Sequence, residues 1–429
     1  MKIAVAVQRY GADINGGAEL HARYIAERLA RHAEVEVLTT CARDYVTWRN
    51  ERPAGVESVN GVTVRRFPVD RERDPREFGR LSHLVFERQH SIADELRWLD
   101  SEGPTSRALV DHLARADAFD FLLLFSFRYY HAYHAARRAT SKAILVPTAE
   151  RDPAVTLGIF GPVFRSVRAI MYNSHEERAM IQAASGNADV PGVVVGVGSE
   201  IPERSDARRF RRTFGIERPF ALYIGRIDEN KGCGELFGHY RRYAQAFPRG
   251  LDLVLIGSAI MPVPDHPRIH HLGFLADADK FDALAASDLL IMPSYFESLS
   301  MVALEAWALG KPVLANGRCD VLRGQCIRSG AGLYYESYEE FSEALYSLES
   351  NGPLHARLGR NGRAYFEANY AWPVIEQKYL DMFARLSRES HSRAIDPLPG
   401  WFARRRADQA PAAERLRLIP SGAVVPQAS

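Results

Sequence analysis

The sequence predicts an α/β protein of two doubly wound, Rossmann-like domains, and three observations lead to this prediction. First, 429 residues exceed what one hydrophobic core usually serves, since domains commonly have ~100–200 residues. Second, short apolar runs alternate with amphipathic helical stretches, which is typical of parallel sheets covered by helices. Third, this alternation starts again near residue 220. Two such domains would face each other across a cleft at the carboxyl ends of their strands.

Apolar runs place the strands of both halves, and amphipathic stretches place the helices between them. The first half has strands at Ile3–Val7, Val35–Thr39, Val62–Phe67, Phe121–Phe125, Ala143–Pro147 and Ala169–Tyr172, with a helix from Gly17 to about Arg31. The second half has strands at Phe220–Ile224, Leu253–Ile256, Leu289–Pro293 and Pro312–Ala315. Its helices are expected at Glu235–Ala246, Lys280–Ala286, Met301–Leu309, Glu339–Leu348, Leu354–Glu367 and Val374–Leu386.

The domain limits follow from changes in composition. Residues 196–219 are rich in Gly, Pro, Arg and Ser without an apolar period, which is typical of a linker. We therefore expect an N-terminal domain at 1–200 and a C-terminal domain at 201–372. A helix at 373–390 is expected to pack back on the N-terminal domain. Residues 391–429, rich in Pro, Ala and Arg, are expected to be poorly ordered.

Charge and composition exclude several classes of protein. The net charge is +2, but six Arg and three acidic residues after Ser390 give that tail +3, so residues 1–390 carry −1. A near-neutral body counts against nucleic-acid binding, which needs a basic surface. The apolar runs fall short of the ~20 residues of a membrane-spanning helix, and the first residues are too short for a signal peptide. Four Cys without CxxC spacing suggest a reducing cytosol.

The strongest local signal lies where the second half begins. Gly225 and Arg226 follow the predicted strand Phe220–Ile224, and Lys231 precedes Gly232, where a helix opens. Backbone N–H groups at such a turn, with two cations, suit a diphosphate; the alternative is a turn with solvated charges. Only six of the 55 basic residues are Lys. A Lys is therefore the unusual choice in this chain, and its compact ammonium is a common point charge for phosphate, which favours the functional interpretation.

A second signal is a loop that presents two carboxylates around a helix start. Glu297 lies in the loop after the strand Leu289–Pro293, Ser300 is a good N-cap, and Glu305 falls about one turn into the helix. Carboxylates accept hydrogen bonds from sugar hydroxyls, and a helix N-terminus suits an anion. The stretch could hold a sugar, a phosphate and a ribose in that order; the alternative is a helix start with two exposed glutamates.

Two weaker motifs complete the survey. Gly16 and Gly17, after Asn15, precede the first helix, and paired glycines let the backbone approach a ligand, although the GxGxxG spacing of a dinucleotide site is missing. Asp277 and Asp279 have the spacing of a DxD metal motif. Because they precede an amphipathic helix, we interpret them as an N-cap and a first-turn charge. We expect neither a metal site nor a cofactor.

The chain resembles the retaining glycosyltransferases of family 4 (glycosyl transferases group 1), which have the GT-B fold. The resemblance rests on Gly225-Arg226 with Lys231-Gly232, followed by Glu297 and Glu305 within "PSYFESLSMVALEAWALGKPVLA". The resemblance covers essentially residues 1–386. It implies that Arg226 and Lys231 bind the donor diphosphate without a metal. It also implies that Glu297 contacts the donor sugar and Glu305 the ribose. Further donor-binding positions implied by it are Gly16, Gly17, Gly225, Leu275, Ser298, Leu299, Ser300 and Met301.

The resemblance implies that the N-terminal domain binds the acceptor. Tyr129, Tyr130 and His131 follow a predicted strand and could stack on a sugar; core packing is the alternative. The family often has a His facing the acceptor after the fifth strand, whereas this chain has Glu150 there.

The implied function is that of a retaining, metal-independent hexosyltransferase. It would move a sugar from a UDP- or GDP-sugar to a glycan or lipid-linked hydroxyl, in the cytoplasm, during cell-surface polysaccharide synthesis. A GT-B nucleotide-sugar epimerase and a non-catalytic GT-B binding protein are the alternatives. The tail with Trp401, Phe402 and Arg404 to Arg406 is interpreted as solvated, or else as a peripheral contact with the inner membrane surface.

Overall fold

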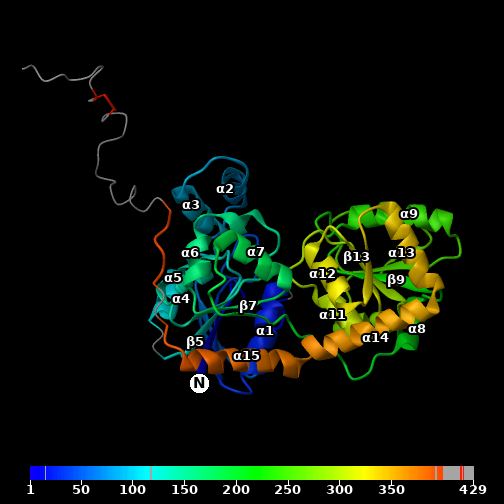
Figure 1. Cartoon of the computed structure of the whole chain (residues 1–429), viewed down its shortest axis with the longest axis horizontal. Helices are drawn as coiled ribbons and strands as arrows, with labels where there is room; N and C mark the ends of the chain where they lie inside the picture. Colours follow the sequence, from blue (N-terminus) through cyan, green and yellow to red (C-terminus); the bar gives the residue numbers. More distant parts are fainter. Residues whose placement is uncertain (15, 116–117, 392–393, 400–415, 418, 420–429) are drawn as a thin grey trace, which may run out of the picture.

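The computed structural model describes residues 1–14, 16–115, 118–391, 394–399, 416, 417 and 419. Two α/β domains lie side by side (Figure 1), which confirms the predicted fold class. The aromatic and basic residues singled out in the tail, from Trp401 to Arg406, lie outside the described residues. None of the helices in the described ranges is both long and apolar enough to cross a membrane.

An eight-stranded sheet forms the centre of the described N-terminal domain, in the order β3-β4-β2-β1-β5-β6-β7-β8. All neighbours are parallel except β3 and β4. The strands are β1 Lys2–Ala6, β2 Glu34–Thr40, β3 Gly55–Val59, β4 Val62–Phe67, β5 Phe121–Phe125, β6 Ala143–Val146, β7 Ala169–Tyr172 and β8 Gly192–Val194. The helices are α1 Gly17–Leu29, α2 Pro75–Glu87, α3 Ile92–Glu102, α4 Arg107–Ala114, α5 Tyr130–Arg138, α6 Phe160–Ser166 and α7 His175–Ser185, with a 3₁₀ turn at Pro153–Thr156.

A six-stranded parallel sheet forms the centre of the described C-terminal domain, in the order β11-β10-β9-β12-β13-β14. The strands are β9 Phe220–Ile224, β10 Asp252–Ile256, β11 Ile269–His271, β12 Leu289–Met292, β13 Val313–Asn316 and β14 Gly332–Tyr335. The helices are α8 Ala207–Phe214, α9 Cys233–Ala246, α10 Asp277–Ala286, α11 Met301–Ala308, α12 Asp320–Ser329, α13 Tyr338–Ser350, α14 Gly352–Asn369 and α15 Trp372–Arg388.

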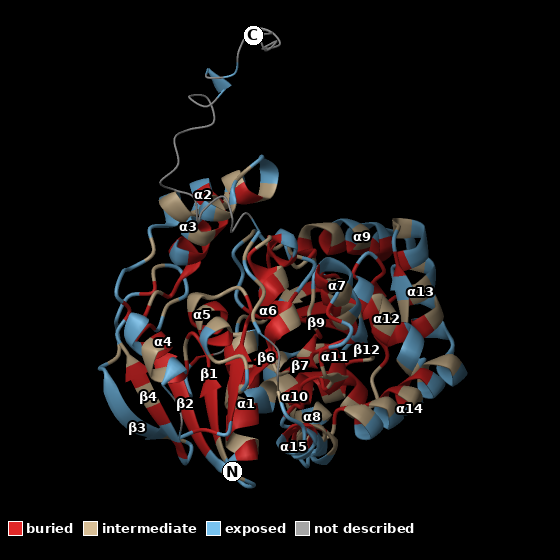
Figure 2. Ribbon diagram, turned by 60° about the vertical axis from the view of Figure 1, so that its left-hand side comes forward, coloured by how far each residue is buried: buried red, intermediate tan, exposed pale blue. Residues whose placement is uncertain are grey.

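Helices cover both faces of each sheet, so the central strands β1, β5, β6, β7, β9, β10, β12 and β13 are almost fully buried, whereas the edge strand β3 is exposed (Figure 2). In β1, Ile3 and Val5 pack into the core on the α1 side, whereas Ala4 and Ala6 pack on the opposite face. Strands buried on both faces appear in the sequence as continuous apolar runs, which is why β5, with the sequence FLLLF, was predictable to the residue.

The predicted linker needs a correction, because α8 lies within residues 196–219. Four of its eight residues are Arg, and these hide a short apolar face in the sequence. Phe210 on that face is only 1% exposed. Its ring lies 4.9 Å from that of Phe214 and 5.8 Å from that of Phe220 in β9. The helix therefore belongs to the packed C-terminal domain and does not act as a loose connection.

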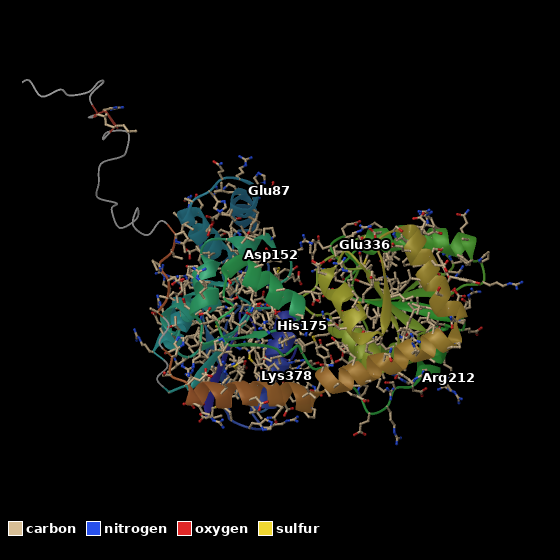
Figure 3. The ribbon with its side chains drawn as sticks, in the orientation of Figure 1. Glu87, Asp152, His175, Arg212, Glu336 and Lys378 are labelled. Carbon is tan, nitrogen blue, oxygen red and sulfur yellow. The ribbon has the colours of Figure 1, made fainter. Side chains whose placement is uncertain are left out.

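The last long helix, α15, returns to the N-terminal domain after α14 ends (Figure 1). The ring of Phe383 stacks on Phe121 of β5 at 5.1 Å, and Arg28 of α1 lies over Trp372 at 4.7 Å. The chain therefore passes between the domains twice. Lys378, labelled in Figure 3, joins the two passages, because its ammonium donates to the carbonyl oxygens of Val195 and Asn369 at 3.2 and 3.0 Å.

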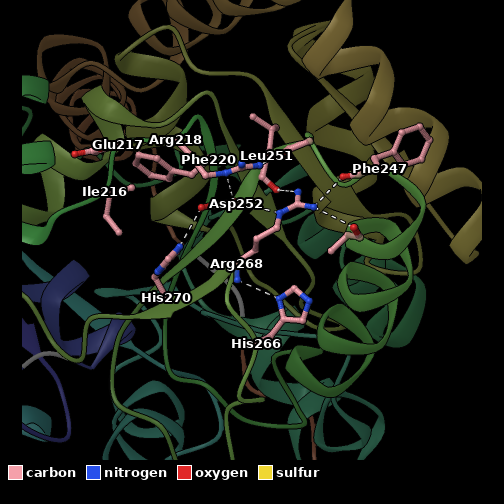
Figure 4. A network of polar contacts seen from close by, with 12 residues as sticks. Ile216, Glu217, Arg218, Phe220, Phe247, Leu251, Asp252, His266, Arg268 and His270 are labelled. Atoms are coloured by element: carbon pink, nitrogen blue, oxygen red, sulfur yellow. Dashed lines mark hydrogen bonds and ion pairs between the residues drawn. The ribbon is translucent and has the colours of Figure 1, made fainter.

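A network of polar contacts lies where strand β10 of the C-terminal sheet begins, at the opposite end of the strands from the loops of the site (Figure 4). Asp252, 3% exposed at the start of β10, accepts from Arg218 at 2.9 Å and from Arg268 at 3.2 Å. His270 lies 3.1 Å from the same carboxyl group. These groups compensate the buried charge of Asp252 and bind three segments of chain together, so they have a structural role.

Candidate functional site

A cleft of about 510 Å³ lies between the domains, at the carboxyl ends of both sheets. In each sheet the strand order reverses beside the first strand, at β1/β5 and at β9/β12, and such switch points leave a crevice for ligands. The N-terminal wall of the cleft consists of Gln8, residues 17–21, 126–129, Pro147, Thr148, Glu150, Asp152 and Asn173. The C-terminal wall consists of Lys231, Lys280, residues 297–302 and Glu305.

The loop after β9 is folded tightly around Asp228, a carboxylate that is 3% exposed. Asp228 accepts a hydrogen bond from the backbone N–H of Lys231 at 2.7 Å and forms an ion pair with Arg226. Gly232 has φ 71°, and a Cβ on it would overlap the carbonyl oxygen of Pro293. Only a glycine therefore lets the two loops approach this closely, which fixes the position of Lys231.

Lys231 meets Glu297 at the centre of the C-terminal wall, with 2.8 Å between Nζ and Oε1. Burial lowers the pKa of the Lys231 ammonium, but Glu297 and Glu150 outweigh this effect, so that the pKa lies above its usual value. The ammonium therefore stays charged at neutral pH. The sequence predicted both residues as parts of the site, but not that they pair.

The start of α11 supplies backbone N–H groups beside this pair. Ser300 is the N-cap, as predicted, and its hydroxyl accepts from the backbone N–H of Ala303 at 3.4 Å. Its φ of 71° lies in the left-handed region, which is uncommon for a residue other than glycine. The loop is held from behind, since the side-chain amide of Gln325 donates to the carbonyl oxygen of Leu299 at 2.5 Å. This helix N-terminus is suited to an anion.

A second Lys–Glu pair lies further along the same wall. Glu305 is 5% exposed, and its Oε1 accepts from the ammonium of Lys280 at 3.1 Å. Its Oε2 has no hydrogen-bond partner within the described part of the chain. The sequence analysis missed Lys280 as a site residue. The scarcity of Lys could have identified it, because two of the six lysines of the chain line this cleft.

The DxD interpretation is corrected in one respect, because the N-cap of α10 is Ala276 and not Asp277. Both carboxylates do lie in the first turn, where Asp277 pairs with Lys280 at 3.2 Å and Asp279 pairs with Arg209 at 2.9 Å. Over the residues that the structure describes, no group of His, Cys, Asp or Glu has an arrangement that could hold a metal ion.

The first turn of α1 forms one edge of the N-terminal wall. A Cβ on Gly17 would meet nothing within 4 Å, so this position faces open space. A Cβ on Gly16 would instead overlap the carboxylate of Glu19, which accepts from Arg9 Nη2 at 2.6 Å. Gly17 thus lines the cleft, and Gly16 makes room for the Arg9–Glu19 pair. Asn15 lies outside the described residues.

Arg128 is held between two carboxylates at the opposite edge of this wall. Its Nε lies 2.7 Å from Glu102 Oε1, and its Nη1 pairs with Asp152. Glu102 also pairs with Arg73 at 2.8 Å, and the carbonyl oxygen of Glu102 accepts from the indole N–H of Trp48 at 2.7 Å. From the sequence, Asp152 was considered with Glu150 as a nucleophile for a double displacement, but its pairing with Arg128 was not predicted, because the partners of Arg128 come from different loops.

Of the four predicted acceptor-side residues, Tyr129 and Glu150 line the cleft, whereas Tyr130 and His131 do not. The ring of Tyr129 makes an edge contact with Trp48, with 5.6 Å between centroids. Tyr130 lies one residue into α5, where its ring packs against His134 at 4.2 Å. His131 is 0% exposed, and burial lowers its pKa to about 4. His131 thus lies in the core, which is the alternative considered for this aromatic run.

Glu150 lies between the walls, in a backbone segment under strain. Its side chain is exposed within the cleft that the two domains form. Partial loss of hydration between the domains raises the pKa of the Glu150 carboxyl, and the charge of Lys231 opposes this shift. Two neighbouring residues of the wall, Ser126 and Thr148, have φ of 63° and 50°, with their hydroxyls 2.9 Å apart. Strain of this kind is typical of functional sites.

The remaining predicted donor residues lie near the cleft but do not line it. Arg226 is paired with Asp228, whose carboxylate raises the pKa of Arg226. Gly225 has φ 156° at the end of β9. Leu275, in the loop before α10, packs against the core.

Comparison with known proteins agrees with this geometry. Residues 205–365 match the model of the family "Glycosyl transferases group 1". A phosphatidyl-myo-inositol mannosyltransferase of Propionibacterium freudenreichii is 33% identical over 195 residues, which are 44% of this chain and 50% of that protein. The chain spans about half the length of the curated relatives that it matches first.

Two solved structures resemble the whole arrangement of both domains. Sucrose-phosphate synthase from Thermosynechococcus elongatus has a TM-score of 0.65 at 16% identity, covering 90% of this chain and 99% of its own. Anabaena Alr3699/HepE in complex with UDP-glucose has a TM-score of 0.63 at 18% identity, covering 90% and 100%. The chain therefore has the GT-B fold, and residues 205–365, within its C-terminal domain, match the glycosyl transferases group 1 family.

Proposed function

We propose that the protein is a retaining glycosyltransferase that moves a sugar from a UDP- or GDP-sugar to a hydroxyl of a glycan or lipid-linked acceptor, in cell-surface polysaccharide synthesis. The observation that carries this proposal is the Lys231–Glu297 pair at the N-terminus of α11, inside a cleft that both domains form. An ammonium, free backbone N–H groups and a carboxylate stand side by side there. These groups match a diphosphate leaving group and the hydroxyls of the sugar attached to it.

The donor side of the reaction is assigned to the C-terminal wall. When the bond between the anomeric carbon and the diphosphate oxygen breaks, negative charge grows on the diphosphate and positive charge on the sugar. Lys231 and the N–H groups of residues 299–301 stabilise the diphosphate. Glu297 accepts hydrogen bonds from sugar hydroxyls, and the unpartnered Oε2 of Glu305 accepts from a ribose hydroxyl. No step of this scheme passes through a metal ion.

The acceptor side is assigned to the N-terminal wall. The acceptor hydroxyl oxygen bonds to the anomeric carbon on the face that the diphosphate leaves, and a phosphate oxygen of the leaving group takes the hydroxyl proton. Attack on that same face retains the anomeric configuration. The structures of Anabaena Alr3699/HepE with UDP and UDP-glucose support a nucleotide sugar as the donor, since that protein shares the fold.

The test is the turnover of Lys231→Ala. UDP- and GDP-sugars, with UDP-glucose and GDP-mannose first, are screened for donor hydrolysis and for thermal stabilisation of the wild-type protein. With the donor that responds, Lys231→Ala should lower kcat by about 10²-fold or more, as the loss of an oxyanion donor does. Lys2→Ala is the matched control, because Lys2 pairs with Glu34 at the opposite end of the N-terminal sheet and should keep wild-type kcat.

Three results would contradict the proposal. Wild-type turnover of Lys231→Ala would remove the assigned role of the ammonium. Conversion of the donor alone into an isomer would identify an epimerase. Calorimetry that detects no binding of any nucleotide or nucleotide sugar would identify a non-catalytic protein.

A further inference from the structure

The N-terminal wall contains buried polar atoms that lack partners. Gln8, His21 and Asn173 all line the cleft and are 1%, 2% and 2% exposed. Among the described residues, the side-chain oxygens of Gln8 and Asn173 and both ring nitrogens of His21 have no hydrogen-bond partner. Burial holds the pKa of His21 at about 3, so its ring is neutral and offers one donor and one acceptor. Buried polar atoms that lack a protein partner and line a cleft are available to hydrogen-bond a molecule bound in it.

The orphaned groups specify the chemistry of that ligand. The two amide oxygens can only accept hydrogen bonds, so they need a partner that donates. Sugar hydroxyls donate and accept, whereas a phosphate dianion only accepts. A phosphate placed against these oxygens would leave them unsatisfied, at the cost of burying them without a partner.

The charges of the same wall lead to the same conclusion. Its described residues include three carboxylates, from Glu19, Glu150 and Asp152, and one guanidinium, from Arg128. Asp152 and Glu102 already occupy the guanidinium, and Glu19 is held by Arg9. An anion that entered this side would meet an already paired guanidinium and the negative field of the Glu150 and Asp152 carboxylates. Like charges in a confined site disfavour binding of the ligand.

We propose that the acceptor presents an unphosphorylated polyhydroxyl group to this wall, and that the Arg128–Asp152 pair, together with Glu150, rejects acceptors that carry a phosphate there. The inference rests on the proposed glycosyl transfer and names the chemical class of its acceptor. The donor diphosphate is not affected by this selection, because its cations and helix N-terminus belong to the C-terminal wall. Asp152 acts here through Arg128, so it is a positioning residue.

The experiment compares matched acceptors. Glucose with glucose 6-phosphate, and mannose with mannose 6-phosphate, are tested for binding to the protein saturated with its nucleotide, and for transfer from the donor found by hydrolysis. The free sugar should bind and react at least about tenfold better than its phosphate. Asp152→Asn should shift this ratio about tenfold towards the phosphate, because it removes one negative charge and leaves Arg128 paired with Glu102 alone.

Asp111→Asn is the matched control, since Asp111 pairs with Arg138 at 2.6 Å on the surface of the same domain. It should leave the ratio unchanged. A phosphorylated sugar that binds as well as the free sugar, or a ratio that Asp152→Asn does not move, overturns the proposal. A further outcome is that neither the free sugar nor the sugar phosphate binds the wild-type protein. In that case, binding of the sugar phosphate to Asp152→Asn supports the proposal, and no binding of the sugar phosphate to Asp152→Asn overturns it. Failure of the proposed glycosyl transfer is distinguishable from failure of this acceptor proposal, because it appears as a lack of donor binding and donor hydrolysis.

Discussion

The two walls of the cleft use the same residue types in different proportions. On the C-terminal wall each carboxylate has its own ammonium, Glu297 with Lys231 and Glu305 with Lys280, and a helix N-terminus lies between the pairs. On the N-terminal wall, as far as the structure describes it, carboxylates outnumber cations and buried amide oxygens lack partners. The comparison indicates that one wall is prepared for an anion and the other for a group that donates hydrogen bonds.

The largest effect expected on the C-terminal wall is on stability, through Glu305→Ala. Burial raises the pKa of Glu305 and Lys280 opposes this, so each charge depends on the other. Loss of the carboxylate leaves the partly buried Lys280 ammonium with only the exposed Asp277 as a partner, which should lower the free energy of unfolding by about 1–3 kcal/mol. Denaturant unfolding measures it.

The double variant Glu305→Leu with Lys280→Met should recover much of that loss, because no buried charge is left unpaired. Glu34→Ala is the control, since it removes the carboxylate of an exposed Lys–Glu pair and should leave the unfolding transition in place. A Glu305→Ala protein as stable as the wild type would mean that the charges of Glu305 and Lys280 do not compensate each other. The difference in charge pairing between the two walls would then have no support from this pair.

The next effect concerns the pH dependence of catalysis. Glu297 raises the pKa of Lys231, and burial lowers it. In Glu297→Gln the effect of burial remains and the largest opposing charge is lost, while Glu150 still acts, so the ammonium should deprotonate at a lower pH. We expect kcat/KM to fall roughly tenfold at neutral pH and its alkaline limb to move to lower pH. A pH–rate profile with the identified donor measures both.

Glu336→Gln provides the control for this profile. Glu336 is a surface carboxylate that lies 3.4 Å from Arg323, away from the cleft. Its profile should match that of the wild type. If Glu297→Gln keeps the wild-type alkaline limb, then Glu297 does not set the charge of Lys231, and the one-to-one pairing on this wall has no functional meaning.

The smallest effect separates the two glycines at the start of α1. Gly17→Ala should raise the thermal stability slightly, by up to about 1 kcal/mol, because the added Cβ enters open space and alanine favours a helix. Gly16→Ala should lower it by roughly 1 kcal/mol, because Glu19 must turn away from Arg9. Thermal unfolding of the two variants is compared directly. The reverse order would show that Gly16, not Gly17, faces the open cleft.

The sequence predicted the strands better than the helices of the N-terminal domain. β4, β5, β7 and β9 have the expected limits. β5, β7 and β9 are buried on both faces and are therefore short apolar runs, whereas β4 alternates between buried and more exposed residues, which is the period of a half-buried strand. Helix α5 has the sequence YHAYHAARR, in which His and Tyr fill buried positions, so its apolar face is hidden. The hairpin strand β3, which is almost entirely exposed, has no apolar run to reveal it.

The same distinction applies to the site. Lys231, Ser300 and Glu297 were predictable because each follows a strand end in a recognisable local pattern. The pairing of Lys231 with Glu297 joins residues 66 positions apart, and Arg128 is bound by residues 24 and 26 positions away on either side. Such contacts depend on how loops converge at a sheet edge. Local spacing carries no information about them.

The double passage of the chain between the domains determines how the cleft can open. At the first passage, a Cβ on Gly196 or Gly198 would overlap the rings of Tyr370 and Trp372, so the two passages are packed directly together, and Lys378 bonds to both. Two connections fastened at one place behave as a hinge with a single axis. The walls can then separate by rotation about that line, while sliding or twisting would break the packing. Donor and acceptor groups would meet in the same register at every closure.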